Sequence, residues 1–380
     1  MRINSFHARV IRNSRGEDAI EVIVNKKYIA SSPSGASTGV HEVSAYPSKG
    51  VRFAVTFLNK YPHFKGFSLE EFSDLSHFDS LVSVIGGNAV VALQLACLKA
   101  MSQGKMYSFL DAHARALPIP LGNCVGGGAH ARQKTLDIQE FLLVPHAKSF
   151  FERAAMNRHV YDVIGKMKNP LGKTDEGAHI LSLSDEGTFS FLSELLDSFH
   201  SYGMSMKLGV DMAASQFYSQ GKYHYNHFST VKKKVLNPSQ QITLVNRWVK
   251  KYGLVYVEDP LQEEDFSGFA KLKKNTLVCG DDLITTNIER LKMALKYKSV
   301  NAIIVKPNQI GSLVKTKELV DFARKKGITM VLSHRSGETM DASLAHLAVG
   351  WRIPYIKIGI FGKEREVKLQ ELIKIEKEIL

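Results

Sequence analysis

The sequence predicts a two-domain protein whose larger domain is an α/β barrel, and three observations lead to this fold class. A chain of 380 residues exceeds the size that a single hydrophobic core normally supports. After residue 200, apolar runs typical of buried strands recur, and three successive intervals have the length of one strand, one helix and two loops. The prolines in Leu117-Pro118-Ile119-Pro120 mark a domain boundary, because proline ends a helix that precedes it.

Residues 1–116 are expected to form a mixed α+β domain, with strands first and helices later. Its most apolar stretch, Leu81 to Leu98, has no charged residue but carries serine, glycine, asparagine and glutamine, so a buried helix with a loop is favoured over a membrane span. Residues 117–380 are long enough for one (β/α)8-type barrel. In such a barrel, chemistry takes place at the carboxyl ends of the strands.

The first residues and the cysteines favour a cytoplasmic protein. No basic segment followed by an apolar core opens the chain, as it would in a secretory signal. The three cysteines, Cys97, Cys124 and Cys279, form no C-x-x-C pair, and their mostly apolar neighbours suit a reducing compartment.

The net charge of +13 permits nonspecific attraction to nucleic acid or to anionic surfaces. Yet the sequence has no basic stripe interleaved with aromatic residues, and it lacks helix-turn-helix or zinc-finger spacing. The densest basic run, Lys232 to Lys234, is more typical of a solvated loop than of a binding patch. We therefore expect no specific nucleic-acid partner.

Polar side chains follow five predicted strands at the point where each strand ends. Because these ends would meet at the mouth of a barrel, the five side chains are expected to converge. From Glu258 onward the spacings are 23, 25 and 28 residues. The residues at these strand ends are Asp211, Glu258, Asp281, Lys306 and His334.

Three carboxylates among these residues predict a metal site. Asp211, Glu258 and Asp281 would repel one another in a barrel mouth unless a cation lay between them. Oxygen ligands without Cys or His favour Mg²⁺ over zinc. Each residue alone is better explained as a helix cap or a surface ion pair, but the repeated position favours a shared ion.

The loop that follows the last of these apolar runs predicts an anion site. It reads Ser333-His334-Arg335-Ser336-Gly337-Glu338-Thr339 and combines cations, hydroxyls and a glycine. Arginine can bind a phosphate through two parallel hydrogen bonds, serine adds a third donor, and histidine can carry a proton. A strand-to-helix turn with a serine cap is the simpler alternative for this segment alone.

Taken in order, these and other motifs resemble the enolase family over nearly the whole chain. The match begins at Ala8-Arg9-Val10 and Asn13 to Gly16 and includes a glycine-rich segment that resembles the family's mobile loop. The matching segments are Pro33 to Gly39, Gly126 to His130, Ile138 to Phe141, Asp175 to Gly177, Asp211 to Ser215, Glu258 to Pro260, Asp281 to Leu283, Lys306 to Gly311 and Ser333 to Thr339.

The resemblance implies a reaction and its catalytic residues. It implies Mg²⁺-dependent dehydration of 2-phosphoglycerate to phosphoenolpyruvate, and the reverse hydration, in glycolysis and gluconeogenesis. Lys306 would be the base that removes the C2 proton, with its pKa lowered by a nearby cation. Glu176, seconded by Glu140, would be the acid that protonates the departing hydroxyl, and crowding of the two carboxyls is expected to raise the pKa of Glu176. His334 would assist.

The resemblance also implies how the ions and substrate are held. Asp211, Glu258 and Asp281 would bind the first Mg²⁺, and Ser37 in the mobile loop of the amino-terminal domain would bind a second that arrives with substrate. The remaining groups would bind substrate: Arg335 and Ser336 its phosphate and Lys357 its carboxylate, with His130 and Glu140 as further substrate-binding residues.

The resemblance further implies a homodimer, or a higher assembly of dimers. Arg15 lies where the family pairs across the subunit interface with a glutamate near the carboxyl terminus, and Glu376 and Glu378 are the available partners. One alternative stays open for the function: a protein with the enolase fold that binds nucleic acid or an anionic surface, with weak or no catalysis. A different proton-abstracting enzyme of the same superfamily is a further, weaker alternative.

Overall fold

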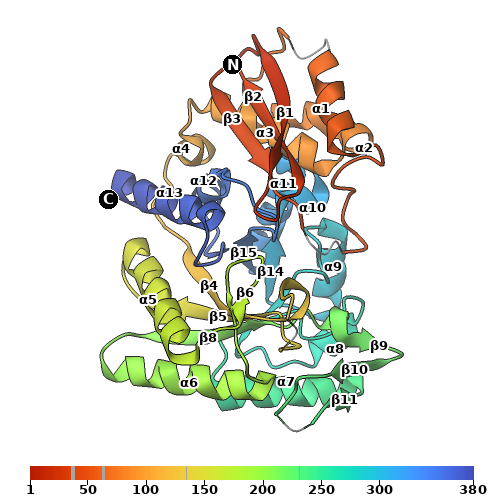
Figure 1. The fold of residues 1–380 in the computed structure, drawn as a ribbon. Coiled ribbons are helices and arrows are strands. Elements are labelled where there is room, and N and C mark those ends of the chain that lie inside the picture. Colours follow the sequence, from red (N-terminus) through yellow and green to blue (C-terminus); the bar gives the residue numbers. More distant parts are fainter. Residues whose placement is uncertain (36–38, 62–64, 134, 231) are drawn as a thin grey trace.

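The computed structural model describes residues 1–35, 39–61, 65–133, 135–230 and 232–380. The amino-terminal strands and helices lie at one end of the molecule, and the barrel lies beneath them (Figure 1). The last helix, α13 (Lys363–Ile379), packs beside the junction of the two parts.

The chain begins with a three-stranded antiparallel sheet formed by β1 (Phe6–Arg12), β2 (Asp18–Val24) and β3 (Tyr28–Ser32). In β2, Ile20, Val22 and Val24 are buried at every second position, which is the period that sends side chains to one face of a strand. This face packs against α3 (Gly87–Met101). The smaller helices around it are α1 (Gly50–Lys60), η2 (Phe72–Leu81), α2 (Val82–Ile85) and α4 (Met106–Leu110).

Helix α3 confirms that the apolar stretch from Leu81 to Leu98 is a buried loop and helix. Its buried residues cover every face, so the helix is an internal element of the domain. The Gln94 amide is buried and donates to the Leu75 carbonyl and to Asp79, both at 2.8 Å. Within the described residues, no helix is both long enough and apolar enough to cross a membrane.

Eight strands close into a barrel, which confirms the predicted fold class. Closure comes from parallel pairing of the last strand with the first, where Tyr355 lies opposite Ile119. In order around the barrel the strands are β4 (Ile119–Gly126), β5 (Glu140–Pro145), β8 (Met206–Asp211), β12 (Tyr256–Glu258), β13 (Leu277–Gly280), β14 (Ala302–Val305), β15 (Thr329–Ser333) and β16 (Tyr355–Lys357).

Strand β5 runs against all the others, so the barrel departs from a uniform (β/α)8 repeat. It pairs antiparallel with both β4 and β8, and Glu140 lies opposite Gly126 on one side and Asp211 on the other. Because the direction is reversed, the first residue of β5 lies at the mouth where the other strands end. A short connection from β4 is sufficient for this pairing, whereas a parallel strand needs a crossover helix.

Helices cover the outside of the barrel, and their first residues explain where they begin. Ser149 and Glu152 form a capping box at the start of α5, while Asn237, Pro238 and Gln240 start α7 in a similar way. The outer helices are α5 (Phe150–Lys168), α6 (Asp185–Ser201), α7 (Pro238–Tyr252), α8 (Phe266–Ala270), α9 (Ile288–Tyr297), α11 (Leu313–Lys325), α12 (Ser343–Gly350) and α13. The short helix α10 (Pro307–Ile310) lies instead at the barrel mouth, where it contacts α3.

Two small hairpins complete the fold. One is formed by β6 (Gly172–Lys173) and β7 (His179–Ile180), and it extends the barrel sheet beside β4. The other belongs to a separate sheet of β9 (Tyr218–Ser219), β10 (Lys222–Tyr225) and β11 (Lys234–Leu236). Glu176 lies in the turn between β6 and β7.

The two parts of the molecule meet at the loop that follows β15. Ser34 forms an antiparallel bridge with Gly337, with backbone bonds of 3.0 and 2.8 Å. The Ser14 amide donates to the Glu338 carbonyl at 2.7 Å, and the Ser14 hydroxyl donates to the Ser336 carbonyl at 3.1 Å. The amino-terminal domain therefore holds the backbone of the predicted anion loop.

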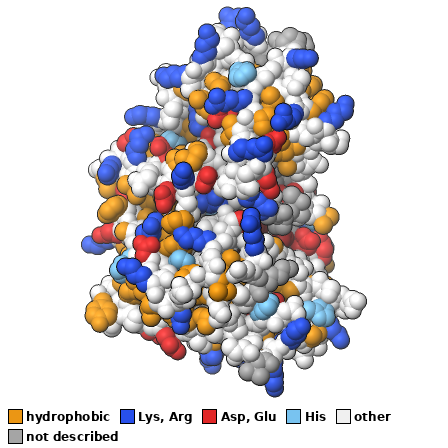
Figure 2. All heavy atoms as spheres, in the orientation of Figure 1, with side chains coloured by type: hydrophobic (Ala, Val, Ile, Leu, Met, Phe, Trp, Pro, Cys, Tyr) orange, Lys and Arg blue, Asp and Glu red, His pale blue; other side chains and the backbone are white. Residues whose placement is uncertain are grey.

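Basic side chains are spread over the face of the molecule drawn in Figure 2. Lys and Arg lie over both parts and are interspersed with acidic and apolar side chains. On the described part of this face they do not gather into one stripe.

Candidate active site

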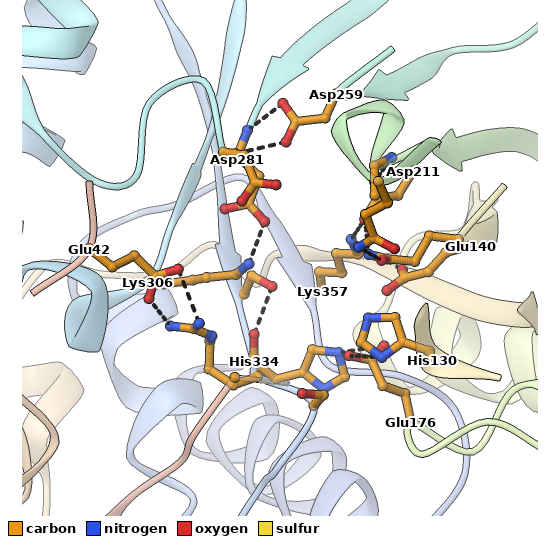
Figure 3. Close-up of a pocket in the computed structure, with 18 residues that line it drawn as sticks. Glu42, His130, Glu140, Glu176, Asp211, Asp259, Asp281, Lys306, His334 and Lys357 are labelled. Atoms are coloured by element: carbon orange, nitrogen blue, oxygen red, sulfur yellow. Dashed lines mark hydrogen bonds and ion pairs between the residues drawn. The ribbon is translucent and has the colours of Figure 1, made fainter. Parts of the chain in front are cut away.

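The mouth of the barrel contains a pocket lined almost entirely by polar side chains. Seven of its lining residues are Asp or Glu, and three are Lys or Arg. They come from the ends of the barrel strands, from the turn with Glu176, and from residues 35 and 42 of the amino-terminal domain. Figure 3 shows ten of these side chains directed toward one another.

Lys357 lies at the centre of the first charge cluster. Its Nζ is 2.8 Å from Asp211 Oδ2, 3.0 Å from both oxygens of Glu258, and 3.1 Å from Glu140 Oε2. Burial lowers the pKa of Lys357, but Asp211, Glu140 and Glu258 outweigh it and hold the pKa well above its usual value. Burial, followed by the charge of Asp211, raises the pKa of Glu258 to about 8. The carboxylates therefore exceed the positive charge available to them.

Lys306 and Asp281 form a second, buried ion pair. Asp281 also accepts from the Gln309 amide at 3.1 Å. Burial lowers the pKa of Lys306, yet Asp281 raises it enough for the net shift to be upward. Burial raises the pKa of Asp281 and Lys306 lowers it, with a downward result. Lys306 is therefore held as an ammonium group by Asp281, whereas the family resemblance implies a lysine whose pKa is lowered by a nearby cation.

Asp259 shapes the turn that presents Asp281. Its two oxygens accept from the backbone amides of Asp281 and Asp282, at 3.0 and 2.7 Å. Burial and the neighbouring Asp282 hold the pKa of Asp259 well above its usual value, and burial with Asp281 raises the pKa of Asp282 to about 7. One oxygen of each of these three residues lies within 4.8 Å of the others.

The third cluster surrounds Glu176. His334 Nε2 lies 3.4 Å from Glu176 Oε2, and His130 Nδ1 lies 3.9 Å from Glu176 Oε1. The turn that holds Glu176 closes at Gly177, whose φ is +86°. A Cβ there would lie 2.6 Å from the Phe361 carbonyl oxygen, so the turn requires glycine.

The pKa shifts within the Glu140–Glu176 pair differ from the expectation at Glu176. Burial raises the pKa of Glu140 well above its usual value. Burial also raises the pKa of Glu176, but His130 and His334 outweigh it and hold the pKa well below the usual value. The expectation of a raised pKa at Glu176 is therefore wrong for this state, because sequence reasoning counted the neighbouring carboxyl and not the two histidines.

Arg335 is held by a carboxylate from the amino-terminal domain. Its Nη1 and Nη2 lie 2.9 and 3.1 Å from the two oxygens of Glu42, and both side chains are buried. Asn308 accepts a further bond from Arg335 at 3.4 Å. The loop with Ser336 is fixed from the barrel side by Arg365, which donates to the Ser336 carbonyl at 2.7 Å.

The donor set suits a hard divalent cation. Asp211 and Glu258 already converge on one cationic atom, Lys357 Nζ, within 3.0 Å. The raised pKa of Glu258 shows that this cluster lacks positive charge. Oxygen donors that are buried, crowded and short of positive charge are the ligands that Mg²⁺ prefers. Asp281 lies with Asp259 and Asp282 at the neighbouring strand end.

The structure places almost all the predicted site residues in this one region. Ser37 lies outside the described residues. Sequence reasoning missed Glu42, Asp259 and Gln139, whose amide donates to Asp211 Oδ2 at 3.2 Å. The available signal was adjacency, since Gln139 and Asp259 lie within matched motifs beside Glu140 and Glu258, and Glu42 lies three residues after the matched segment that ends at Gly39. The predicted residues that meet here are His130, Glu140, Glu176, Asp211, Glu258, Asp281, Lys306, His334, Arg335, Ser336 and Lys357.

The fold and the site define an α/β-barrel enzyme with an acidic, lysine-containing mouth. Residues 114–380 match the family model described as the enolase C-terminal TIM barrel domain. The chain is 38% identical to the enolase of Archaeoglobus fulgidus, over 99% of this chain and 97% of that protein. It is also 38% identical to the enolase of Methanothermobacter thermautotrophicus, with 99% and 97% covered, and 36% identical to that of Picrophilus torridus, with 100% and 99% covered.

These similarities show that the chain belongs to the enolase family. It is accordingly a lyase, and the family resemblance inferred from the motifs is confirmed.

Proposed function

We propose that the chain catalyses the Mg²⁺-dependent dehydration of 2-phosphoglycerate to phosphoenolpyruvate, and the reverse hydration, as a step of glycolysis and gluconeogenesis. The observation that carries the proposal is the arrangement of proton-transfer groups. Lys306 lies on one side of the pocket and the Glu140–Glu176 pair on the other, with Lys357 between them (Figure 3). Removing a proton from one carbon and water from the next needs a base and an acid, and these groups on two sides of the pocket can supply both.

Lys306 is the proposed base for the C2 proton. Its partner Asp281 keeps it charged, and this ion pair must be exchanged before the amine can accept a proton. Asp281 is also a proposed metal ligand, so cation binding and release of the lysine would be linked. When bound, Mg²⁺ would stabilise the negative charge that develops on the substrate carboxylate. We propose two such ions per site, the second held by Ser37 and arriving with substrate.

The Glu140–Glu176 pair is the proposed acid for the C3 hydroxyl. The pKa of Glu140 is raised and that of Glu176 is lowered, so the pair can share one proton and donate it to a departing hydroxyl. His130 and His334 stabilise the charged partner, Glu176. Assignment of the transferred proton to one residue depends on substrate binding, since the pair titrates as a unit.

Three cationic or hydroxyl groups would hold the substrate anions. Arg335 and Ser336 are the proposed phosphate ligands, and Lys357 the carboxylate ligand. Two parallel hydrogen bonds to Glu42 fix the orientation of the planar Arg335 guanidinium.

A spectrophotometric assay of phosphoenolpyruvate formation tests the proposed function. Purified protein should convert 2-phosphoglycerate when Mg²⁺ is present, lose activity when the ion is removed by a chelator, and recover it when Mg²⁺ is restored. Absence of conversion by folded, Mg²⁺-supplied protein would contradict the proposal. Binding of nucleic acid by such an inactive protein would support the alternative of a binding function.

We further propose a cytoplasmic homodimer. Arg15, which was expected to form an ion pair across the subunit interface, pairs with Asp175 of its own chain at 2.7 Å. Glu376 accepts from the Phe150 and Phe151 amides at the start of α5, and Glu378 accepts from the Tyr107 hydroxyl at 3.0 Å. Apolar area must therefore supply the stability of such a dimer.

A further inference from the structure

Asp175 connects the site to the amino-terminal domain through a single carboxylate. Its Oδ1 lies 2.7 Å from His130 Nδ1, and its Oδ2 lies 2.7 Å from Arg15 Nη1. The Asp175 amide also donates to the His130 carbonyl at 3.2 Å. His130 lines the pocket, whereas Arg15 lies in the turn between β1 and β2.

The contact with Asp175 fixes which nitrogen of His130 carries the proton. An ionised carboxylate only accepts hydrogen bonds, so Nδ1 must be the protonated nitrogen in the neutral ring. Nε2 is then the nitrogen that can accept a hydrogen bond from a bound substrate. Arg15 contributes by occupying the other oxygen, which prevents the carboxylate from turning away from the ring.

The turn that carries Arg15 is itself held firmly. Asn13 Oδ1 accepts from the Arg15 amide at 2.9 Å, and Glu17 accepts from Arg15 Nε at 3.1 Å. The neighbouring Ser14 bonds the loop after β15, as described above. The position of the guanidinium is therefore set by the docking of the amino-terminal domain on the barrel.

We infer that Asp175 and Arg15 are positioning residues that fix the orientation and tautomer of His130 for its contact with substrate. The inference rests on the proposed function to the extent that His130 serves the substrate. Its structural part, the tautomer, can be measured without any activity.

Replacing Asp175 by asparagine should invert the tautomer. Arg15 cannot give up its protons, so the amide oxygen of Asn would face the guanidinium and the amide nitrogen would face His130. That nitrogen is a donor and would require His130 Nδ1 to be the acceptor. Nε2 would then carry the proton and present a donor where the substrate meets an acceptor.

The decisive experiment combines Asp175→Asn with Arg15→Met. In the double variant the amide oxygen is free to turn back to His130, so the original tautomer should return. We expect Asp175→Asn to lower kcat/KM by about 100-fold, and the double variant to recover about tenfold of that loss. Arg15→Met alone should lower kcat/KM by less than about fivefold, because the carboxylate still accepts from Nδ1.

Nuclear magnetic resonance of ¹⁵N-histidine reports the tautomer directly. The signals of His130 are assigned by their loss in His130→Gln, and wild type should show protonated Nδ1. Asp175→Asn should show protonated Nε2, and the double variant should again show protonated Nδ1. Arg12→Met is the matched control, since Arg12 lies in the same hairpin but pairs with Asp18 and the Gly16 carbonyl. It should leave both readouts unchanged.

Two outcomes would overturn the inference: a wild-type tautomer in Asp175→Asn, or a double variant no more active than Asp175→Asn. If Asp175→Asn does not fold, Arg15→Met carries the test. It removes a cation next to Asp175 and should raise the pH midpoint of His130, which also faces Glu176 and the charge of Asp211. An unchanged midpoint would contradict the inference. Failure of the wild type to dehydrate 2-phosphoglycerate would refute the proposed function and leave the tautomer result standing.

Discussion

The mouth and the interior of the barrel are built from the same strands, but the interior buries apolar side chains whereas the mouth buries charged ones. The interior contains an apolar layer formed by Leu121, Leu142, Val144, Tyr256, Cys279, Ala302, Ile304 and Val331. Two residues further along three of these strands, the side chains become charged: Glu258 follows Tyr256, Asp281 follows Cys279, and Lys306 follows Ile304. Tyr256 and Glu258, for example, are 1% and 0% exposed.

The difference shows where stability is gained and where it is given up. Burying the apolar layer stabilises the fold by about 25 cal/mol for each Å² removed from water. Burying a charge costs several kcal/mol unless a partner compensates for it. Substitutions in the interior should therefore affect stability alone, whereas substitutions at the mouth should affect chemistry first.

Lys306→Ala should produce the largest loss of activity. We expect dehydration to fall by about 10,000-fold, because the variant lacks the proposed base. Exchange of the C2 proton with solvent should stop as well, while Mg²⁺ binding, measured by calorimetry, is retained. Lys207→Ala, an exposed lysine on β8, is the control and should be fully active. Near wild-type exchange in Lys306→Ala would exclude this lysine as the base.

Glu176→Gln should separate the two proton transfers. Net dehydration should fall by about 1,000-fold, because departure of the hydroxyl needs the acid. Exchange of the C2 proton should continue, since Lys306 remains. Glu140→Gln provides the comparison at the other member of the pair. If Glu176→Gln retains both activities and Glu140→Gln loses dehydration, Glu140 is the acid.

Lys357→Met should show the cost of the buried carboxylates. Without the lysine, Asp211, Glu258 and Glu140 face one another, and the free energy of unfolding should fall by about 3–5 kcal/mol. The loss should be larger at high pH. Carboxyls whose pKa is raised in the fold are protonated at low pH, and the free energy of unfolding falls as they ionise with rising pH.

Chemical denaturation with and without Mg²⁺ measures the Lys357→Met effect. The cation should restore part of the lost stability, and it should stabilise the variant more than the wild type. Lys207→Met serves as the exposed control. If the free energy of unfolding of the variant without Mg²⁺ lies within about 1 kcal/mol of the wild-type value, the charge balance described for this cluster is contradicted.

Ile304→Val tests the interior side of the comparison. Removing one buried methyl group from the apolar layer should lower the free energy of unfolding by about 0.5–1.5 kcal/mol. kcat/KM should stay within about twofold of wild type, since the substituted group lies beneath the mouth and not in it. A large loss of activity with little loss of stability would show that the two regions are not independent.

Glu371→Gln should have the smallest effect and a defined pH dependence. His346 lies 3.1 Å from Glu371 and lowers its pKa from 4.5 to about 2. A depressed carboxyl pKa stabilises the fold above the unfolded value, and this contribution is lost as the pH falls from 4.5 to about 2. The variant should lose about 0.5–1 kcal/mol at neutral pH.

The stability difference between wild type and Glu371→Gln should close in acid. Thermal unfolding between neutral pH and the acid range measures it. Glu318→Gln, on the exposed side of α11, is the control and should match the wild type throughout. A difference that does not change with pH would show that this pair contributes through packing and not through charge.

The sequence alone predicts the parts of the site that repeat with the strands. Asp211, Glu258, Asp281, Lys306 and His334 share a position at the ends of successive strands, and that periodicity predicts their convergence. Glu140 breaks the pattern because β5 is reversed, so it stands at the start of its strand. Its placement in the site came from the resemblance to the enolase family and not from the repeat.

Contacts across the domain boundary could not be predicted from the sequence. Glu42 and Arg335 are 293 residues apart, and no periodicity connects a loop of one domain with a strand end of another. The direction of the pKa shift at Glu176 likewise depends on two histidines from different loops. Such features follow from how the domains dock, which local patterns do not specify.

The bonds between Ser14 and the loop after β15 also constrain how the chain folds. The Ser14 hydroxyl and its acceptor, the Ser336 carbonyl, are separated by 322 positions. The amino-terminal sheet leaves the ribosome first, but the surface that receives it exists only after β15 has joined the barrel. Contacts this distant in sequence form slowly, because loop closure must precede them. Assembly of the pocket is therefore among the last events of folding, and a partly synthesised chain has no complete site.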